Sequence, residues 1–80
     1  MARRPPIANR IRDLRKQHGA MTQAELGYAI GVTRQTVIAI ESGKYSPSLD
    51  VAFRIALVFN VPLEEVFQYQ TPDEERIGER

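Results

Sequence analysis

The sequence contains no cysteine, no tryptophan and only one histidine. Without cysteine the chain can form neither a disulfide nor a thiolate zinc site, and one histidine cannot supply a histidine-based metal cluster. No glycine-rich phosphate loop is present, and the only histidine, His18, lies in a charged stretch. We therefore expect no enzyme activity, no metal, no cofactor and no small-molecule ligand, and side-chain packing alone must stabilise the fold.

A long hydrophobic run is also missing. The most apolar stretch, residues 51–59, is interrupted by Arg54 and is far shorter than the roughly 20 residues that a membrane-spanning helix needs. The charged start, Met-Ala-Arg-Arg-Pro-Pro, has no apolar stretch behind it and does not resemble a signal peptide. These absences predict a cytoplasmic protein with no membrane partner. Its 80 residues suffice for one domain, whose core is marginal unless a second copy shares it.

The formal net charge is only +1, but the charges are unevenly distributed along the chain. Residues 1–54 contain nine Lys and Arg against four acids, whereas residues 55–80 contain two Arg against six acids. A basic front and an acidic rear would orient the molecule on a polyanion such as nucleic acid. Two solvated faces of different charge would give the same pattern.

Four residues that tolerate a left-handed backbone follow apolar-periodic runs, and a helix is predicted to end at each. They are Gly19, Gly31, Gly43 and Asn60. The first helix is predicted over residues 7–18, after the stop at Pro5-Pro6, with Ile7, Ile11 and Leu14 on its inner face. Thr22 and Glu25 form a capping box that begins the second helix. The expected buried side of that helix consists of Ala24, Leu26, Ala29 and Ile30.

The remaining elements follow from the same kind of pattern. Thr33 is the predicted N-cap of a third helix, about residues 34–42. Ser48, after Pro47, opens a fourth helix that is apolar almost all round as far as Phe59, so we expect it to be buried on every side, partly by a partner subunit. Pro62 suits the first turn of a fifth helix. Its apolar side carries Leu63, Val66 and Phe67, and residues 68–71 then favour a short strand or extended segment.

The second and third helices meet the geometric requirement of a helix-turn-helix, a DNA-binding unit. Their N-caps lie close together in the sequence, and Gly31-Val32 joins them. With Val37 and Ile40 turned inward, the outer side of the third helix carries Arg34, Gln35, Thr36 and, one turn later, Ile38. Arginine can bond guanine, glutamine can bond adenine, and threonine can bond either or touch a thymine methyl. Ile38 either touches a thymine methyl or packs against the fourth helix.

Four segments carry a family resemblance by residue type and spacing together. They are Thr22-Gln23-Ala24-Glu25-Leu26, Gly31-Val32-Thr33-Arg34-Gln35-Thr36-Val37, Ile40-Glu41-Ser42-Gly43-Lys44 and Pro47-Ser48-Leu49. Over roughly residues 7–67 the chain resembles the Cro/cI (xenobiotic-response-element) family of helix-turn-helix regulators. From Tyr45 to Gln68 it is similar to the smallest dimeric members, which have five helices and a short antiparallel strand pair.

The resemblance implies an all-α, five-helix, lambda-repressor-like fold with a short C-terminal strand or extended segment. Arg34, Gln35 and Thr36 match base-reading positions of the family. The positions that match phosphate contacts are Gln23, Ser42, Lys44, Tyr45 and Ser46. Arg15 and Glu41 match a structural ion pair that fixes the third helix.

The chain departs from the family at two places. The connection Ala20-Met21-Thr22 is one residue longer than in many relatives, so either the first helix ends later or the connection bulges. The strand-forming start of the smallest members is replaced by Arg3-Arg4-Pro5-Pro6. The sequence therefore predicts the C-terminal strand without identifying a partner for it within the chain.

These features predict three regions and one principal function. Residues 1–6 form a flexible basic arm, residues 7–71 the DNA-binding and dimerisation domain, and residues 72–80 a disordered charged tail. We expect a homodimer that binds the palindromic operator of double-stranded DNA and represses transcription. The expected dimer interface, for which a place in the core is the alternative, consists of Phe59, Val61, Val66, Phe67 and Tyr69. A second hypothesis is an antitoxin whose tail folds on a protein partner while the domain binds its own promoter.

Overall fold

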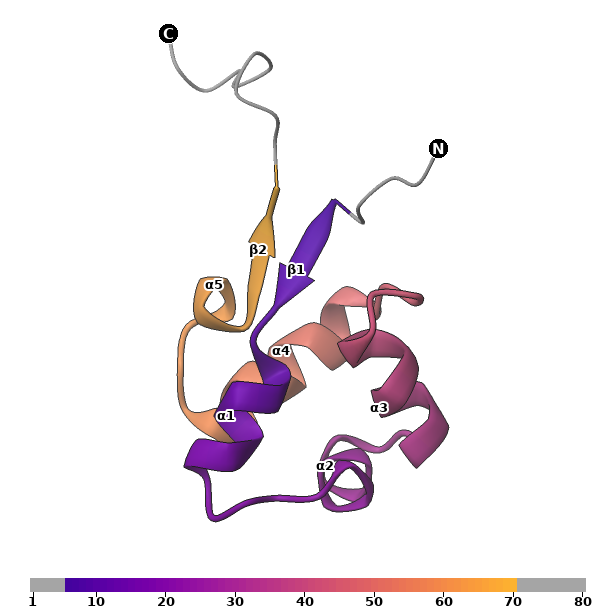
Figure 1. Ribbon diagram of the computed structural model, residues 1–80, viewed down its shortest axis with the longest axis vertical. Helices are drawn as coiled ribbons and strands as arrows, with labels where there is room; N and C mark the ends of the chain where they lie inside the picture. Colours follow the sequence, from indigo (N-terminus) through magenta and orange to yellow (C-terminus); the bar gives the residue numbers. More distant parts are fainter. Residues whose placement is uncertain (1–5, 71–80) are drawn as a thin grey trace, which may run out of the picture.

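Five helices and one two-stranded sheet make up residues 6–70, the part of the chain that the computed structural model describes (Figure 1). The elements are β1 (Ile7–Asn9), α1 (Ile11–Gln17), α2 (Gln23–Ile30), α3 (Arg34–Glu41), α4 (Leu49–Phe59), α5 (Leu63–Val66) and β2 (Phe67–Tyr69). The predicted five-helix architecture with a C-terminal strand is confirmed. Except for Pro6, the expected arm (1–6) and tail (72–80) lie outside the described residues.

Side-chain caps set where three of the helices begin. The hydroxyls of Thr22, Thr33 and Ser48 each accept a hydrogen bond from the backbone N–H three residues later, at 3.0, 3.1 and 3.2 Å. These bonds satisfy amides that the first turn of a helix leaves without a partner. Gly31 and Asn60 end α2 and α4 in the left-handed conformation, as their positions in the sequence predict.

The connection between α1 and α2 takes up its additional residue as a bulge. Helix α1 ends at Gln17, and Gly19 and Ala20 follow with φ angles of 71° and 56°. The backbone N–H of Met21 then donates to the carbonyl of Arg15 at 3.0 Å, which returns the chain towards α1. Of the two alternatives, a longer helix and a bulged connection, the structure shows the second.

The start of the chain differs from the prediction, because residues 7–9 form a strand and not the first turn of a helix. Strand β1 pairs antiparallel with β2, with Ile7 opposite Tyr69 and Asn9 opposite Phe67. The backbone N–H of Arg10 donates to the carbonyl of Val66 at 2.9 Å and extends this connection. The helical spacing of Ile7 with Ile11 is overridden by a pairing partner that lies at the other end of the domain.

The hydrophobic core receives side chains from all five helices. Its members are Ile11, Leu14, Leu26, Ile30, Val37, Ile40, Ile55, Ala56, Phe59 and Val66. In α2 the inner residues are Leu26, Gly27 and Ile30, so the prediction was wrong for Ala24 and Ala29, which are exposed. Among the described residues no polar or charged side chain is buried, so packing of apolar side chains is the main stabilising term.

Helix α4 is buried on one face only, contrary to the prediction. Ala52, Ile55, Ala56 and Phe59 face the core. Leu49, Phe53 and Leu57 face outward and are 67%, 49% and 77% exposed. The helix packs mainly against α2 and α5, and these two elements are too few to surround it.

The predicted dimer interface was wrong for two of its residues. Phe59 is 2% exposed and Val66 is completely buried, so neither can meet another subunit. The reason is that α5 folds back over the end of α4, and the His18 ring contacts Phe59 edge-on with 5.0 Å between ring centroids. Val61 and Phe67 are half-buried against the core, and Tyr69 is 69% exposed.

None of the helices in residues 6–70 has the length and apolar character to cross a bilayer.

Candidate nucleic-acid interface

Helices α2 and α3 form a closely packed pair joined by a short turn. Thr22 and Glu25 make the predicted capping box at the start of α2: the Glu25 side chain accepts from the Thr22 N–H at 2.9 Å, and the Thr22 hydroxyl accepts from the Glu25 N–H. Gly27 lies directly beneath the turn, where a Cβ atom would come within 2.8 Å of the Val32 carbonyl oxygen. The close packing of α2 against this turn therefore requires glycine at position 27.

Helix α3 turns two residues inward and presents its N-terminal residues to solvent. Val37 and Ile40 are buried, whereas Arg34 and Gln35 are exposed. Thr36 is half-buried, and its hydroxyl lies 3.0 Å from that of the N-cap Thr33. Together with Ile38, which is also half-buried, these residues form one side of α3, which we call the α3 outer face (Arg34, Gln35, Thr36 and Ile38).

The loop after α3 begins with a tight turn. Gly43 has a φ angle of 81°, and the backbone N–H groups of Lys44 and Tyr45 both donate to the Ala39 carbonyl, at 2.9 and 3.2 Å. The Ser42 hydroxyl donates to the same carbonyl at 3.2 Å. Ser42, Lys44, Tyr45 and Ser46 are all exposed at this end of α3. The structure thus places the four predicted loop contacts together, next to the α3 outer face along the chain.

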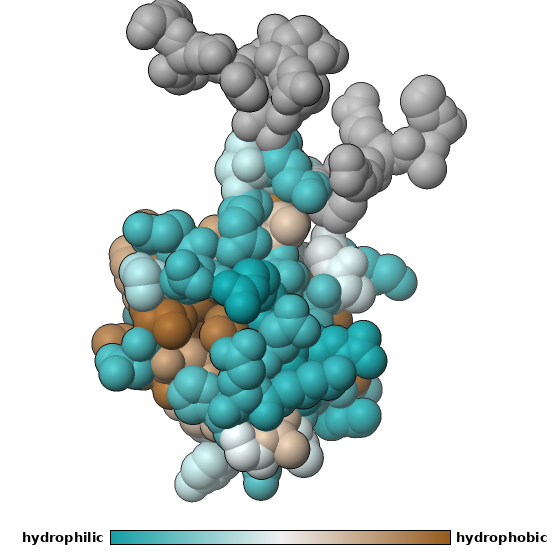
Figure 2. Space-filling view, turned by 60° about the vertical axis from the view of Figure 1, so that its left-hand side comes forward, coloured by the Kyte–Doolittle hydropathy of each residue, from teal (hydrophilic) through white to brown (hydrophobic). Residues whose placement is uncertain are grey.

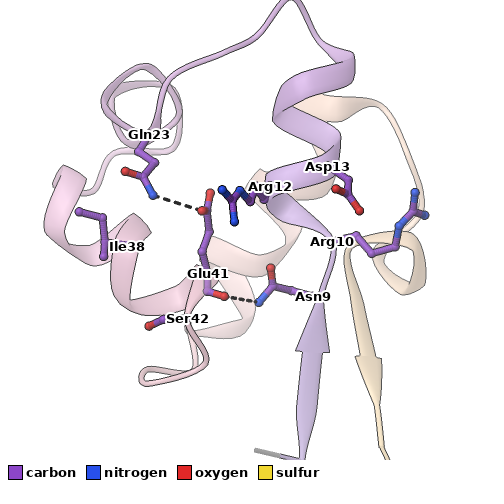
Figure 3. A pocket seen from close by; sticks show the side chains of 8 residues that line it. All are labelled: Asn9, Arg10, Arg12, Asp13, Gln23, Ile38, Glu41 and Ser42. Atoms are coloured by element: carbon purple, nitrogen blue, oxygen red, sulfur yellow. Dashed lines mark hydrogen bonds between the residues drawn. The ribbon is translucent and has the colours of Figure 1, made fainter.

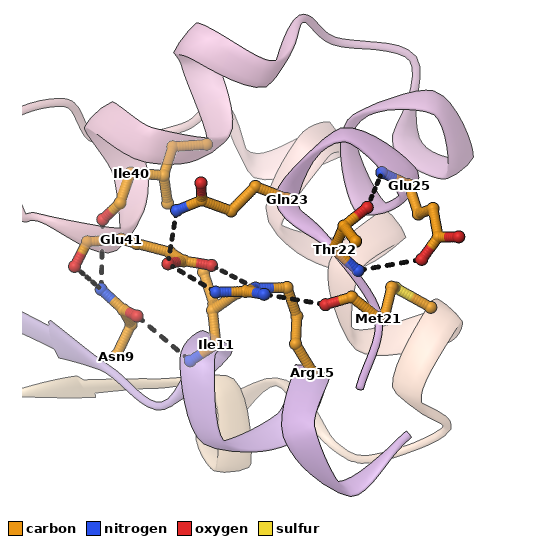
Figure 4. Close-up of polar contacts among 9 residues, drawn as sticks. All are labelled: Asn9, Ile11, Arg15, Met21, Thr22, Gln23, Glu25, Ile40 and Glu41. Atoms are coloured by element: carbon orange, nitrogen blue, oxygen red, sulfur yellow. Dashed lines mark hydrogen bonds and ion pairs between the residues drawn. The ribbon is translucent and has the colours of Figure 1, made fainter. Parts of the chain in front are cut away.

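A partly buried ion pair fixes the C-terminal end of α3 to α1 (Figure 4). Arg15 Nε donates to Glu41 Oε2 at 2.6 Å and Arg15 Nη2 donates to Glu41 Oε1 at 3.2 Å, a bidentate contact between side chains only 14% and 10% exposed. Arg15 Nη1 also donates to the Met21 carbonyl at 2.8 Å. This is the pair that the sequence predicted, and two parallel charge-assisted bonds fix orientation as well as distance.

Gln23 joins the same network from the first turn of α2. Its Nε2 atom donates to Glu41 Oε1 at 3.2 Å, so one carboxylate links α1, α2 and α3. The Gln23 side chain is half-buried and has a defined position at the edge of the α3 outer face. Gln23 Oε1 takes no part in the bonds of this network.

Asn9 is a residue of this region that the sequence did not reveal. Its Nδ2 atom donates to the carbonyls of Ile40 and Glu41, at 3.1 and 3.3 Å, and its Oδ1 atom accepts from the backbone N–H of Ile11 at 3.1 Å. One side chain therefore satisfies both the last carbonyls of α3 and an amide at the start of α1. The local pattern Asn9-Arg10-Ile11 shows the second contact as an Asx-type turn, whereas nothing local indicates the first.

Two open grooves flank the outer surface of α1 and α3. The first, about 430 Å³, is lined by Asn9, Arg10, Arg12, Asp13, Gln23, Ile38, Glu41 and Ser42 (Figure 3). The second, about 730 Å³, reaches Arg34 at the start of α3. Arg12, Gln23 and Glu41 line both. Figure 3 shows Arg12 pointing from α1 towards α3, which adds a cation that the sequence could not distinguish from its charged neighbours.

Chemically, this surface combines exposed hydrogen-bond donors with cations and contains few acids. Arg12, Arg34 and Lys44 are exposed, while the carboxylate of Glu41 is neutralised by Arg15. Amide and guanidinium groups on a helix that protrudes from the bundle are suited to polar edges in a groove, and cations beside them are suited to phosphates.

A family model described as helix-turn-helix matches residues 11–66, which include both helices and their turn. The chain belongs to the helix-turn-helix family. The resemblance to its Cro/cI branch is confirmed, and this is a family of DNA-binding transcription regulators, not of enzymes. The helix-turn-helix unit of this chain is the pair α2 and α3.

Relatives of nearly the same length are known in archaea. A helix-turn-helix-type transcriptional regulator from Archaeoglobus fulgidus is 47% identical over 72 residues, which cover 90% of this chain and 99% of the relative. Another from Methanocaldococcus jannaschii is 48% identical over 64 residues, or 80% of this chain and 96% of the relative. The transcriptional repressor RstR of the cryptic phage CTXphi from Vibrio cholerae is 36% identical over 60 residues, or 75% of this chain and 53% of the repressor.

The fold also has a close counterpart among solved structures. A crystal structure of a protein from Bacteroides fragilis, provisionally described as DNA-binding, superposes with a TM-score of 0.67 at 26% sequence identity. The match covers 78% of this chain and 98% of that chain.

Proposed function

We propose that this helix-turn-helix protein is a dimeric repressor that acts in the cytoplasm and reads a palindromic operator with α3 in the major groove. The observation that carries the proposal is the division of α3 into two sides. Val37 and Ile40 anchor it in the core, while Arg34 and Gln35 are exposed at its N-terminal end. A recognition helix needs this arrangement, because its N-terminal residues contact base edges while its inner side holds it in place.

The α3 outer face would make the base contacts. Arg34 fits guanine and Gln35 fits adenine, each through two hydrogen bonds. Thr36 has a hydroxyl already paired with Thr33, so its methyl group is free to contact a thymine methyl. Ile38 lies one turn further along and lines a groove beside Ser42, which supports an apolar contact with DNA over burial against α4.

Phosphate contacts would surround these base contacts. The candidates are Gln23, Ser42, Lys44, Tyr45, Ser46 and, added by the structure, Arg12. Gln23 is held in position by Glu41, and a donor that is already fixed loses less entropy on binding. Contacts to the phosphate chain set the register of the protein on the duplex, whereas the base contacts supply specificity.

Repression and dimerisation are supported by the relatives and by symmetry. RstR, which is 36% identical over its matched residues, is a transcriptional repressor. A small domain with one recognition helix reads few base pairs, and a two-fold pair of such helices, about 34 Å apart on DNA, doubles the length of the site that is read.

The test is selection of bound duplexes from a random DNA pool, carried out with the full chain and with Gln35→Ala. We expect the full chain to enrich a palindrome with half-sites one helical turn apart. We expect Gln35→Ala to relax the preference at one base pair per half-site, at a cost of about 1–3 kcal/mol on the selected site, because one bidentate contact is lost.

The matched control is Gln17→Ala, at the exposed end of α1, which should select the same operator with unchanged affinity. Enrichment of no sequence, with only salt-sensitive bulk binding, would contradict operator recognition and would favour the antitoxin hypothesis, in which a protein partner is needed.

A further inference from the structure

The outer side of α4 carries three large apolar side chains in a row. Leu49, Phe53 and Leu57 are 67%, 49% and 77% exposed, and their spacing of four residues places them along one side of the helix. We call this surface the α4 stripe (Leu49, Phe53 and Leu57). With a rise of about 1.5 Å per residue, it is about 12 Å long. The DNA-binding residues on α2 and α3 do not include it.

Such a surface is unusual for a chain that remains alone in water. Scattered exposed apolar residues are common, but a contiguous apolar row on a helix marks an interaction surface. Figure 2, in which the side of the molecule with α5 comes forward, shows that polar residues cover most of that face and apolar ones gather in a limited area. On that face, exposed apolar side chains are therefore concentrated and not evenly spread.

The chain's own ends offer little that could cover the α4 stripe. Residues 1–5 contain one large apolar residue, Met1, and residues 71–80 contain only Ile77 among ten residues rich in charge. DNA does not fit as the occupant, because the stripe itself carries no cation and Arg54 beside it is paired with Asp50, which leaves little to attract a polyanion. An apolar surface of another molecule would supply such a cover.

The charges beside the stripe fit a second copy of the same helix. Asp50 and Arg54 lie next to the stripe on the helical wheel, form an ion pair at 2.9 Å, and have side chains 71% and 50% exposed. If two α4 helices cross antiparallel about a two-fold axis at Phe53, Leu49 faces Leu57 of the partner subunit. Each Arg54 then lies about 3 Å along the axis from Asp50 of the partner subunit, since two residues separate the levels. The charges beside the stripe are then complementary across the axis, as an isologous interface requires.

We infer that the α4 stripe is the homodimer interface of this protein, formed by two antiparallel α4 helices. The inference rests on the homodimer of the proposed function. It assigns the dimer interface to the exposed α4 stripe in place of Phe59 and Val66, which are buried within one subunit. Tyr69 on β2 then lies outside the contact. Two recognition helices become related by the axis that passes between the α4 helices.

The first test is the molecular mass of the purified 80-residue protein without DNA, measured by sedimentation equilibrium over a range of concentrations. The wild-type chain is expected to reach twice the 9.1 kDa of one chain. Leu57→Glu is expected to remain at the mass of one chain, because two carboxylates would be placed in an apolar contact. Circular dichroism checks that the variant keeps its helices. We expect it to be folded, because the Leu57 side chain is 77% exposed in one subunit.

The control is Tyr69→Glu, which adds the same charge at an exposed aromatic residue of the interface predicted from sequence. It is expected to dimerise as the wild type does. If Tyr69→Glu is monomeric and Leu57→Glu dimeric, the inference is overturned and the interface lies at the sheet. A wild-type protein that is monomeric at every concentration also overturns it.

A second variant tests the antiparallel pairing directly. Leu49→Lys combined with Leu57→Glu in one chain is expected to restore the dimer mass, because each new cation would face a new anion of the other subunit. The two positions are eight residues apart, too far for this pairing within one chain. A double variant that stays folded and monomeric would contradict the antiparallel arrangement.

Failure of this inference and failure of DNA binding are distinguishable. The molecular mass is measured without DNA, so its result does not depend on whether the protein binds an operator. In a separate binding measurement, Leu57→Glu should keep the wild-type affinity for a duplex with one half-site and lose the additional affinity for the palindrome. Loss of affinity for the single half-site would indicate damage to the recognition surface and contradict a role confined to dimerisation.

Discussion

Gly27 controls how closely α2 approaches the turn that leads into the recognition helix. It is buried, and a Cβ atom built on it would lie 2.8 Å from the Val32 carbonyl oxygen and 3.3 Å from the Thr33 carbonyl carbon. The same turn contains the hydrogen bond from the Val32 N–H to the Gly27 carbonyl, at 2.9 Å. The atoms nearest to such a Cβ atom belong to the backbone of Val32 and Thr33, which cannot rotate away as a flexible side chain would.

We predict that Gly27→Ala lowers the free energy of unfolding by up to about 2 kcal/mol. Alanine is better than glycine in a helix by about 1 kcal/mol, but forcing an extra methyl group into a packed site costs about 1–3 kcal/mol. Because the clash moves the turn, α3 shifts relative to α2 and operator affinity falls as well. Urea denaturation followed by circular dichroism measures the first effect, and titration with the selected operator measures the second.

Ala29→Gly is the matched control, since Ala29 lies on the exposed side of the same helix. It should also lower stability, by about 1 kcal/mol through helix propensity, but it should leave operator affinity unchanged in conditions where the protein is folded. A Gly27→Ala variant more stable than the wild type would show that the turn adapts and that the close approach has no role.

At the scale of elements, the predictable features were those encoded by neighbouring residues. The capping box at Thr22 and the N-caps Thr33 and Ser48 fixed the starts of α2, α3 and α4, because a side-chain oxygen and the amide that it caps are three residues apart. Strand β1 could not be predicted, since its partner Phe67–Tyr69 is at the far end of the domain and Ile7 also fits a helical spacing. Here a long-range pairing outweighs a local pattern.

The candidate site shows the same division. The outward direction of Arg34 and Gln35 follows from the inward direction of Val37 and Ile40, which helical geometry dictates. The contacts of Asn9 with α3 follow from the strand pairing, so they were as unpredictable as the strand. The buried positions of Phe59 and Val66 depend on where α5 folds back, and this is a tertiary property that an apolar pattern does not specify.

We predict that Asn9→Asp weakens the attachment of α3 to the rest of the domain. An aspartate keeps the acceptor for the Ile11 N–H, but it loses the donor to the carbonyls of Ile40 and Glu41 and places a charged oxygen near them. Leaving these part-buried groups without a partner should cost about 1–3 kcal/mol of unfolding free energy. Operator affinity should fall while the preferred sequence stays the same, because the base-reading side chains are unchanged.

Gln68→Glu controls for the change of charge. Gln68 Nε2 also donates to a carbonyl, that of Glu64 at 3.0 Å, but this bond is exposed to solvent. Gln68→Glu adds the same negative charge as Asn9→Asp. It should change the free energy of unfolding by less than about 0.5 kcal/mol, as is usual for surface substitutions. If both variants lose the same stability and the same affinity, the added charge is responsible and Asn9 has no special role.

At the scale of the whole molecule, the elements that carry opposite charge lie apart. Figure 1 shows α3, with Arg34, and α5, with Glu64 and Glu65, on opposite sides of the bundle with α4 between them. Within residues 6–70, the α3 side therefore presents Arg34, whereas α5 presents two carboxylates, of which Glu65 is paired with Arg10 at 3.0 Å. A polyanion would be attracted to the α3 side and repelled from the α5 side, which orients the protein before any base is read.

The salt dependence of operator binding reports which cations take part in this attraction. Each phosphate neutralised by the protein contributes about −0.9 to the slope of log affinity against log salt concentration. Lys44, exposed in the loop after α3, should be one of these contacts, so Lys44→Ala should reduce the magnitude of the slope by about one unit and weaken specific and random duplexes alike. Lys16→Ala removes the same charge from α1 at a position that lines neither groove, and its slope should stay close to that of the wild type.

Equal slopes for the two variants would mean that overall charge, and not a contact made by the loop, attracts the protein to DNA. A fall in affinity confined to the operator would instead assign Lys44 to base recognition.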